Sequence, residues 1–393
     1  MLALTNAVQA YAWGAVDGLA RLVGTPATGG AEAELWVGAH PSAPSRTSAG
    51  RPLDQVIAED PEGVLGREVT DRFGGRLPFL LKVLAIGAPL SIQLHPSPEQ
   101  ARDGYAREEA AGVARDDPRR SYRDPHAKPE VLVALEPTWV LAGFRTGAAA
   151  ADALEVVAGG APAVADLQAR VADAPDARAG LIHLLSAPDA ERSALAAAAT
   201  GADPADGPAA GWTAALAEAH PGDPSALSPL LLELRRLEPG QGIFLPAGVP
   251  HLYLHGAGVE LMGASDNVVR GGLTAKHVDR DELVRLLAPP GVGPDLLPGV
   301  TTGDGATAYI TGTPEIALHR MDLRPDGVAI APEPAGPALV LAVHGTARLA
   351  ADGAREDLGH GRAVLVPAGE RADVRAEGSG TAWWATVGPS TGR

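Results

Sequence analysis

The feature that most constrains the fold of this chain is an internal repeat of a short β-type pattern. The segment GQGIFLPAG (240–248) recurs as GRAVLVPAG (361–369), and each copy is an apolar run that ends in a Pro-Ala-Gly turn. A repeat of this kind indicates two copies of one β-architecture. The residue five positions after the turn proline is His251 in the first copy and Ala372 in the second. A metal ligand at that position can therefore belong to the first copy only.

Further strand-like segments surround the repeat. Residues 77–96 contain two apolar runs separated around 87–89, and a third run begins at Lys128. Short apolar runs bounded by Gly and Pro are typical of strands, whereas the polar residues 97–120 between them predict a helical excursion. After about residue 300 the chain consists almost wholly of short apolar runs and turns. We therefore expect a mainly β protein.

An alanine-rich stretch punctuated by Gly and Pro interrupts this pattern at residues 146–227. Because alanine is the strongest helix former and Gly or Pro commonly end helices, we expect an α-helical insertion, with a low-complexity linker as the alternative. The expected organisation is one β-barrel from residues 1–145 together with 228–300, the helical insertion, and a second barrel at 301–393 without a metal. A length of 393 residues accommodates these units.

Composition excludes several classes of partner and ligand. The chain has no cysteine, which excludes disulfides and thiolate metal sites and leaves His, carboxylate and amide ligands. A net charge of -16 opposes non-specific binding to nucleic acid or to an anionic membrane surface. The sequence shows neither a signal-peptide pattern nor an apolar run of about 18 residues. We expect a cytoplasmic protein.

Three strand segments each place a set of polar side chains on one face of the strand. Period-2 alternation gives these sets as Ser91, Gln93 and His95 in SIQLHP, Lys128 and Glu130 in AKPEVLVAL, and His251, Tyr253 and His255 in HLYLHG. One histidine alone is weak evidence, but one amide, two imidazoles and one carboxylate can together complete a metal shell. We expect one divalent ion per chain, held by Gln93, His95, Glu130 and His251. His and Glu suit zinc, although manganese, iron, cobalt and nickel accept the same ligands.

Lysine is rare in this chain. Lys and Arg total 32, yet the only lysines are Lys82, Lys128 and Lys276. Since the two side chains differ in shape, hydration and pKa, this usage indicates a specific need for an ammonium at three places, with chance retention as the alternative.

Longer motifs resemble one enzyme family. Residues 251–276, HLYLHGAGVELMGASDNVVRGGLTAK, closely resemble the long signature of type I phosphomannose isomerases. YRDPHAKPE (122–130) resembles a second family signature, which ends with the Glu on the metal, and LSIQLHP contains the family's Gln and His ligands. YAWG (11–14) and AELWVGAHP (33–41) are similar to its amino-terminal motifs. The resemblance implies two cupin-type (jelly-roll) barrels with a helical domain between them, and a zinc-dependent isomerase.

The chain departs from the family pattern at three places. The family usually has Asn-His before Lys-Pro-Glu, whereas this chain has His126 and Ala127, so any role of that histidine is lost or has moved to His126. Gly271 replaces the usual Ala, and Ala275 replaces the usual Pro. These changes affect loop shape more than ligand identity.

The implied reaction interconverts mannose 6-phosphate and fructose 6-phosphate through an enediol, which requires an acid, a base and a group that stabilises the developing oxyanion. Glu260 or Asp266 is the expected proton carrier, and Arg270 the oxyanion stabiliser. For Glu260 the alternative is a structural ion pair with Arg270, and for Asp266 a turn formed by Ser-Asp-Asn. Family analogy adds further site residues: Lys276 among the catalytic groups, and Ser91, Lys82, Lys128 and Trp13 for substrate binding, although Trp13 could instead be barrel packing.

Three other functions stay open at this point. One is an isomerase of another phosphorylated or unphosphorylated sugar. Another is a non-catalytic sugar-binding cupin, against which the joint presence of Glu260, Asp266, Arg270 and Lys276 argues. The third is a metal oxygenase, which usually shows a histidine-rich open triad and no lysine cluster. We expect a monomer whose partner is a small sugar phosphate.

Overall fold

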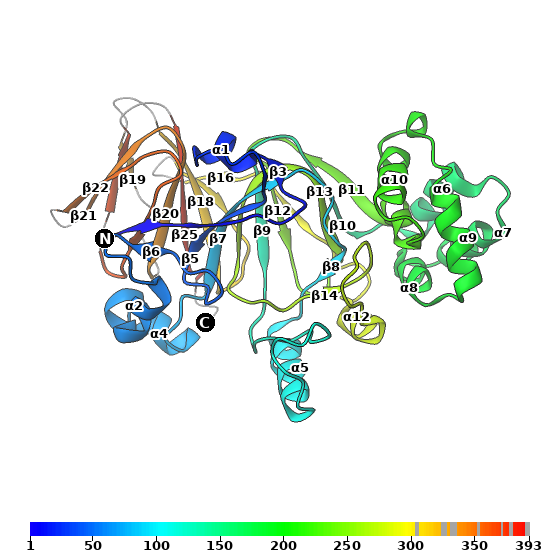
Figure 1. Cartoon of the computed structure of the whole chain (residues 1–393), viewed down its shortest axis with the longest axis horizontal. Helices are drawn as coiled ribbons and strands as arrows, with labels where there is room; N and C mark the ends of the chain where they lie inside the picture. Colours follow the sequence, from blue (N-terminus) through cyan, green and yellow to red (C-terminus); the bar gives the residue numbers. More distant parts are fainter. Residues whose placement is uncertain are drawn as a thin grey trace.

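The computed structural model describes residues 1–302, 306–323, 328–330, 336–351, 354–370, 372–376 and 380–389. The other residues of the expected second barrel, 301–393, lie outside this description. Two β-structures lie side by side, and a group of helices is gathered at one end of the molecule (Figure 1). No helix in the described part of the chain is both long enough and apolar enough to cross a membrane.

The larger β-structure is an 11-stranded sheet. Its main path runs through β15 (Asp295–Leu297), β12 (Gly242–Leu245), β9 (Glu130–Ala134), β13 (His251–Gly263), β7 (Phe79–Ile86), β5 (Glu34–Gly38) and β2 (Ala7–Gln9). Four more strands join it: β10 (Thr138–Phe144), β11 (Leu232–Leu237), β8 (Gln93–Leu94) and β14 (Val269–Arg270). The long strand β13 pairs with β7, β8, β9 and β10, so it connects the whole barrel.

The smaller β-structure contains an 8-stranded sheet. Its order is β16 (Val300–Thr301), β17 (Thr307–Tyr309), β18 (Ala317–Leu323), β25 (Gly380–Thr386), β20 (Ala338–His344), β23 (Ala363–Val366), β1 (Leu2–Thr5) and β6 (Arg46–Thr47). A 4-stranded sheet lies beside it, in the order β19 (Val328–Ile330), β24 (Ala372–Ala376), β21 (Ala347–Ala351) and β22 (Ala354–Leu358). A short pair, β3 (Ala15–Val16) and β4 (Ala31–Glu32), completes the strands of the described residues.

The first strand of the chain lies in the carboxy-terminal sheet, although residues 1–145 were expected in the other barrel. β1 is antiparallel to β23, with Leu2 opposite Leu365, and the amino group of Met1 lies 2.8 Å from a carboxylate oxygen of Glu370. Leu4 is buried in a core cluster that includes residues of both β-structures. Apolar burial and strand pairing therefore place β1 in the carboxy-terminal sheet. Such long-range contacts do not follow from position along the sequence.

The repeated nine-residue pattern occupies equivalent places in the two β-structures. The first copy forms β12 and the second forms β23, and in each case the turn glycine, Gly248 or Gly369, has a left-handed backbone with φ of 74° or 83°. The next strand begins at His251 in one copy and at Ala372 in the other. The repeat thus predicted a structural correspondence correctly.

The alanine-rich stretch is helical. It contains α6 (Gly147–Ala158), α7 (Pro162–Val171), α8 (Arg178–Ser186), α9 (Asp189–Ala199), α10 (Pro208–Ala219) and two short 3-10 helices, η1 (Pro204–Asp206) and η2 (Pro224–Leu227). One more short helix, α11 (Ser228–Leu231), follows directly, so the helical part extends four residues beyond the expected bound. The leucines of these helices, such as Leu154, Leu167 and Leu184, form one core with Leu141 of β10 and Leu252 of β13. The prediction of a mainly β chain with an α-helical insertion is confirmed, and the linker alternative is wrong.

The other helices of the described residues lie between strands. They are α1 (Gly18–Val23), α2 (Leu53–Glu59), α3 (Pro61–Leu65), α4 (Arg67–Phe73), α5 (Pro98–Ala110) and α12 (Arg280–Leu286). The helix α5 is the predicted excursion, and it begins at a capping box in which Ser97 and Gln100 each bond the other's backbone N–H. The helices α2 to α4 were not predicted from the sequence.

Candidate active site

Three buried side chains converge at one end of the larger barrel. His95 directly follows Leu94 at the end of β8, Glu130 opens β9, and His251 opens β13. Their exposed fractions are 2%, 3% and 4%. His95 Nε2 lies 3.2 Å from Glu130 Oε1, and His251 Nε2 lies 3.3 Å from Glu130 Oε2. One ligand atom from each residue lies within 4.8 Å of the others, which is a spacing that suits a shared metal ion.

The hydrogen bonds of the two imidazoles fix which ring nitrogen carries the proton. His95 Nδ1 lies 2.8 Å from the carbonyl oxygen of Asn267, and His251 Nδ1 lies 3.0 Å from that of Val249. A carbonyl only accepts, so both Nδ1 atoms donate and both Nε2 atoms present lone pairs. Burial, followed by the charge of Lys128, lowers the pKa of His95 to about 4, so this ring is neutral at pH 7.

The neutral rings face an ionised carboxylate. Burial opposes ionisation of Glu130, but the charge of Lys128 is the largest of the influences that hold its pKa well below the usual range. Two nitrogen lone pairs and a carboxylate therefore point at one another, and the buried His95 Nε2 has no hydrogen-bond donor to satisfy it. Such an arrangement of acceptors is stabilised by a cation at its centre, so the residues fit a metal.

Gln93, the fourth expected ligand, lies beside this group. Its backbone pairs with His251 on one side and with Arg270 on the other. Its side chain lines the two cavities that open at the site. Among the described residues, no second group of three His, Asp or Glu side chains has metal-binding geometry.

A buried row of charged groups continues from the metal ligands. Lys82 Nζ lies 3.4 Å from a carboxylate oxygen of Glu34 and 3.3 Å from one of Glu260, and the Tyr253 hydroxyl donates to Glu260 at 3.0 Å. Burial raises the pKa of Glu260, against the opposing charge of Lys82. Lys128 Nζ lies 2.8 Å from Glu130 Oε1. The expected alternative, an ion pair between Glu260 and Arg270, is wrong, because Glu260 forms its ion pair with Lys82.

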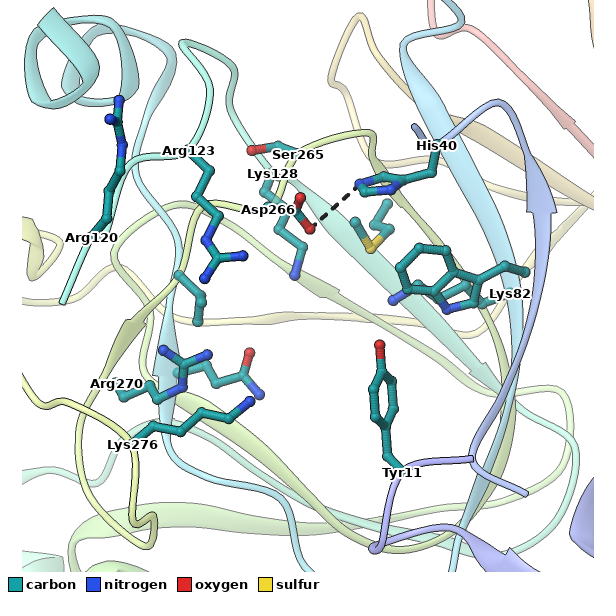
Figure 2. Close-up of a pocket in the computed structure, with 14 residues that line it drawn as sticks. Tyr11, His40, Lys82, Arg120, Arg123, Lys128, Ser265, Asp266, Arg270 and Lys276 are labelled. Carbon is teal, nitrogen blue, oxygen red and sulfur yellow. Dashed lines mark ion pairs between the residues drawn. The ribbon is translucent and has the colours of Figure 1, made fainter. Parts of the chain in front are cut away.

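The outer cavity, of about 240 Å³, is rich in cations. Figure 2 shows the charged ends of Arg123, Lys128, Arg270 and Lys276 directed toward the same space. Burial, followed by the charges of Arg270 and Arg123, lowers the pKa of Lys276. Within the described part of the chain, Arg123, Arg270 and Lys276 have no carboxylate partner within 4.0 Å. We call this space the substrate pocket; it joins an inner cavity of about 60 Å³ next to Glu130 and Glu260.

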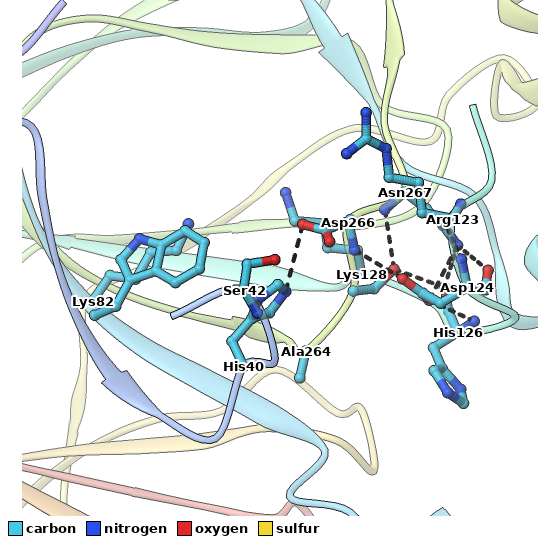
Figure 3. A network of polar contacts seen from close by, with 12 residues as sticks. His40, Ser42, Lys82, Arg123, Asp124, His126, Lys128, Ala264, Asp266 and Asn267 are labelled. Carbon is cyan, nitrogen blue, oxygen red and sulfur yellow. Dashed lines mark hydrogen bonds and ion pairs between the residues drawn. The ribbon is translucent and has the colours of Figure 1, made fainter. Parts of the chain in front are cut away.

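The Ser-Asp-Asn segment forms a hydrogen-bonded loop at the edge of the substrate pocket. Ser265 Oγ donates to Asp124 Oδ1 at 2.8 Å. The Asn267 side-chain amide donates to the carbonyl oxygens of Asp124 and His126 at 2.7 and 2.9 Å (Figure 3). These bonds hold a loop in shape. Asp266 between them lines the substrate pocket, and its Oδ1 lies 3.4 Å from His40 Nε2.

Two expected substrate contacts lie elsewhere. Among the described residues that line the substrate pocket and the inner cavity, Ser91 and Trp13 are absent. Trp13 packs against the core cluster that contains Tyr253 and stacks on Tyr11 with ring centroids 6.0 Å apart. His255 is exposed, since the register of β13 on β10 shifts next to it and a bulge turns the side chain outward.

Three residues that the structure brings to the site were not predicted from the sequence. Arg123 and Tyr11 line the substrate pocket, and Glu34 holds Lys82 in the inner cavity. All three belong to quoted motifs, YRDPHAKPE, YAWG and AELWVGAHP. Their presence in these motifs was the available signal.

Fold and site together define a metal-binding protein with a cupin-type barrel. Comparison with known proteins narrows this class. A family model described as phosphomannose isomerase type I, catalytic domain, matches residues 1–147. Mannose-6-phosphate isomerase of Escherichia coli (strain K12) is 41% identical over 290 residues, which cover 72% of this chain and 74% of that protein. The chain belongs to the type I phosphomannose isomerase family.

Other relatives extend the match over nearly the whole chain. Mannose-6-phosphate isomerase of Salmonella typhimurium is 35% identical over 97% of this chain and 98% of that protein. A crystal structure of mannose 6-phosphate isomerase bound with zinc and yttrium has a TM-score of 0.88 at 32% identity and covers 99% of this chain and 100% of that chain. A zinc-bound crystal structure of mannose 6-phosphate isomerase has a TM-score of 0.86, and the match covers 99% of each chain. The expected cupin-type fold is confirmed.

Proposed function

We propose that this chain is a zinc-dependent mannose-6-phosphate isomerase that interconverts mannose 6-phosphate and fructose 6-phosphate. One observation carries the proposal: a buried cluster of metal-ligand acceptors opens into a pocket lined by cations without carboxylate partners. A sugar phosphate needs both features, because its reacting oxygens require polarisation and its phosphate requires positive charge. The zinc-bound relatives support the choice of metal.

Gln93, His95, Glu130 and His251 are the proposed zinc ligands. Zinc bound there supplies Lewis-acid polarisation of the substrate oxygens at C1 and C2. The protein's own contribution is to hold the ligands: the carbonyls of Asn267 and Val249 orient the two rings before the metal binds.

Glu260 is the proposed proton carrier between C1 and C2. It lies in the inner cavity beside Glu130, and burial raises its pKa, which makes the carboxylate a stronger base than an exposed one. Tyr253 and Lys82 hold its two oxygens, which fixes the direction of the remaining lone pairs. Asp266 is the alternative carrier; contact with His40 lowers its pKa, which makes it the weaker base.

Arg123, Arg270 and Lys276 are proposed to receive the anionic parts of the substrate. Arg270 is opposite Gln93 in the strand pair, so it lies on the metal side of the pocket and can stabilise the oxyanion of the enediol. Arg123 and Lys276, which line the same pocket, are proposed to bind the phosphate. Lys128, which contacts Glu130, would lie between the phosphate and the metal ligands.

A substrate panel tests the function and separates it from its nearest rival, isomerisation of another sugar. Mannose, glucose and fructose are each supplied with and without the 6-phosphate, and the product is followed by NMR. We expect conversion of mannose 6-phosphate to fructose 6-phosphate, loss of activity after treatment with a chelator, and its return with zinc. Faster turnover of an unphosphorylated sugar, or full activity after exhaustive chelation, would contradict the proposal.

A monomeric state and a cytoplasmic location stay predictions. Light scattering on the purified chain checks the first, and fractionation of cells that produce it checks the second.

A further inference from the structure

A second cavity, of about 420 Å³, lies against the wall of the substrate pocket. Both spaces are lined by His40, Arg123 and Asp266. The contact between His40 and Asp266 therefore lies between them, and Figure 3 shows this pair between Lys82 on one side and the Asp124 loop on the other. We call the second space the side cavity.

The side cavity has the character of a small-molecule site. Its apolar lining comes from α2 and from the loops next to β5, β7 and β13: Ala39, Pro41, Ile57, Ala58, Leu77 and Ala264. Ligand sites are typically apolar spaces of about 300 to 1,000 Å³ with a few polar groups that fix orientation. The substrate pocket differs, because charged and polar side chains dominate its lining.

Three guanidinium groups line the side cavity, those of Arg76, Arg115 and Arg123. Arg115 lies 3.7 Å from Glu109, so Arg76 and Arg123 are the two without a carboxylate partner among the described residues. Among the described residues, Arg76 donates only to the carbonyl oxygen of Ala264, at 3.4 Å, and its buried Nε has no hydrogen-bond partner there. Arg123 has no side-chain hydrogen bond and no ion pair among the described residues. Burial lowers the pKa of Arg76, and the charges of Asp124 and Glu315 offset this only in part. An anion in the cavity would stabilise both groups.

The carboxylates of the cavity are mostly committed to the protein. Asp124 accepts bonds from Ser265 Oγ and from the backbone N–H groups of His126 and Asp266, and Asp266 itself contacts His40. Asp54, on α2, is different, because its buried Oδ1 has no hydrogen-bond partner. The lining thus offers two free cations, one free acceptor and an apolar floor.

We propose that the side cavity binds a small hydroxylated organic acid as an effector, with the acid group on Arg76 and Arg123 and the hydroxyl directed to Asp54. The apolar body of such a ligand covers the floor formed by Ile57, Ala58 and Leu77. A sugar phosphate fits less well, because its ring hydroxyls would face this floor without partners.

Arg123 couples the side cavity to the substrate pocket. An acid that binds Arg123 from the side cavity withdraws a cation from the substrate phosphate, so KM rises while kcat is kept. Linkage requires that bound substrate weakens binding of the acid by the same factor by which the acid weakens binding of substrate. The rise in KM should therefore reach a plateau once the side cavity is full. This kinetic consequence rests on the proposed function, whereas binding of the acid does not.

Titration calorimetry on the full-length, zinc-loaded chain tests the site, with 4-hydroxybenzoate as the probe and benzoate as the probe without the hydroxyl. We expect one molecule bound per chain, weaker binding of benzoate, and binding that persists, though weakened, at saturating mannose 6-phosphate. Complete displacement by substrate, or no binding at all, would overturn the proposal.

Two variants assign the site. Arg76→Gln removes the charge, and we expect a loss of affinity of about tenfold or more with unchanged basal kcat and KM. Ala58→Leu fills the cavity from the exposed side of α2 and should abolish binding without touching Arg76. Arg102→Gln, at an exposed position of α5, is the matched control and should bind as the unmodified chain does. Unchanged binding by folded Ala58→Leu protein would contradict the site even if Arg76→Gln did not fold.

Discussion

Glu130 is the residue on which the candidate site depends. It contacts both imidazoles and Lys128, so it joins the metal ligands to the cations that face the substrate. Period-2 alternation predicts that Glu130 and Lys128 share a face, and their side chains lie 2.8 Å apart. The residues that escaped prediction, Arg123 and Glu34, reach the site through loop conformation and through cross-strand contact, which alternation along one strand does not encode.

Replacement of His251 tests the metal site. His251→Ala removes one ligand and leaves Glu130 facing a void, so we expect metal content and activity to fall together, by roughly a hundredfold or more in activity. Elemental analysis and the isomerase assay measure the two quantities. His255→Ala, four residues along the same strand and exposed, is the control and should retain both.

Replacement of Glu260 separates proton transfer from metal binding. Glu260→Gln keeps the shape of the side chain and lies outside the ligand group, so we expect normal zinc content with kcat lowered by about 10² to 10⁴. Glu218→Gln, at an exposed position of α10, should leave kcat unchanged. A Glu260→Gln protein of normal rate would move the proton-carrier role to Asp266.

The metal-free chain should lose stability on acidification. His95 has a folded pKa of about 4 against 6.5 in the unfolded chain, so between these values the unfolded state binds more protons. Its contribution to the free energy of unfolding is therefore present above pH 6.5 and lost as pH falls toward 4, in the same direction as that of Glu130. Urea unfolding of chelator-treated protein at pH 7 and pH 5 measures this. The difference in the free energy of unfolding between pH 7 and pH 5 should be smaller in His95→Gln.

At the scale of elements, the two copies of the repeat show which structural features a sequence pattern can predict and which it cannot. The pattern predicted equivalent strands, β12 and β23, followed by equivalent turns. It did not predict β-bulges, so the outward turn of His255 was missed. Nor did it predict α2 to α4, whose short segments contain too few turns for a clear helical period.

The turn glycines of the two copies provide a matched pair of mutations. Both have positive φ, so alanine costs about 1 kcal/mol of backbone strain at either place. At Gly369 an added Cβ meets nothing within 4 Å, whereas at Gly248 it would lie 2.3 Å from the carbonyl oxygen of Leu286. We expect Gly248→Ala to lower the free energy of unfolding clearly more than Gly369→Ala does. Equal losses would show that the turn relaxes away from α12.

At the scale of the whole molecule, the two β-structures share one core. Leu4, Leu35 and Val83 lie in the same buried cluster as Leu339 and Trp383. The expected boundary between 1–145 and 301–393 is therefore crossed by packing as well as by strand pairing. The chain passes from the 11-stranded to the 8-stranded sheet between β15 and β16, and β1, at the amino terminus, lies in the 8-stranded sheet, which no local sequence pattern indicates.

Leu4 tests this shared core. Leu4→Ala removes a buried side chain, so we expect a loss of about 2 to 5 kcal/mol in the free energy of unfolding. The loss should appear in hydrogen exchange as faster exchange in β23 and β20, more than 330 residues along the chain from the mutation. Val8→Ala, on β2 and 43% exposed, is the control. Exchange that rises only near residue 4 would contradict a shared core.

The pairing of β1 with β23 also bears on how the chain comes to be folded during its synthesis. Leu2 has no partner until Leu365 has been made. The other edge of β1 pairs with β6, which is made early, but at about 5 to 20 residues per second the edge that faces β23 waits on the order of 20 to 70 s unpaired. Contacts of such long range are the slowest to form, since loop closure precedes any gain from them. The end of the chain that leaves the ribosome first is thus among the last to reach its final place, and in that interval it depends on chaperones or on a low concentration of neighbours to avoid wrong pairing.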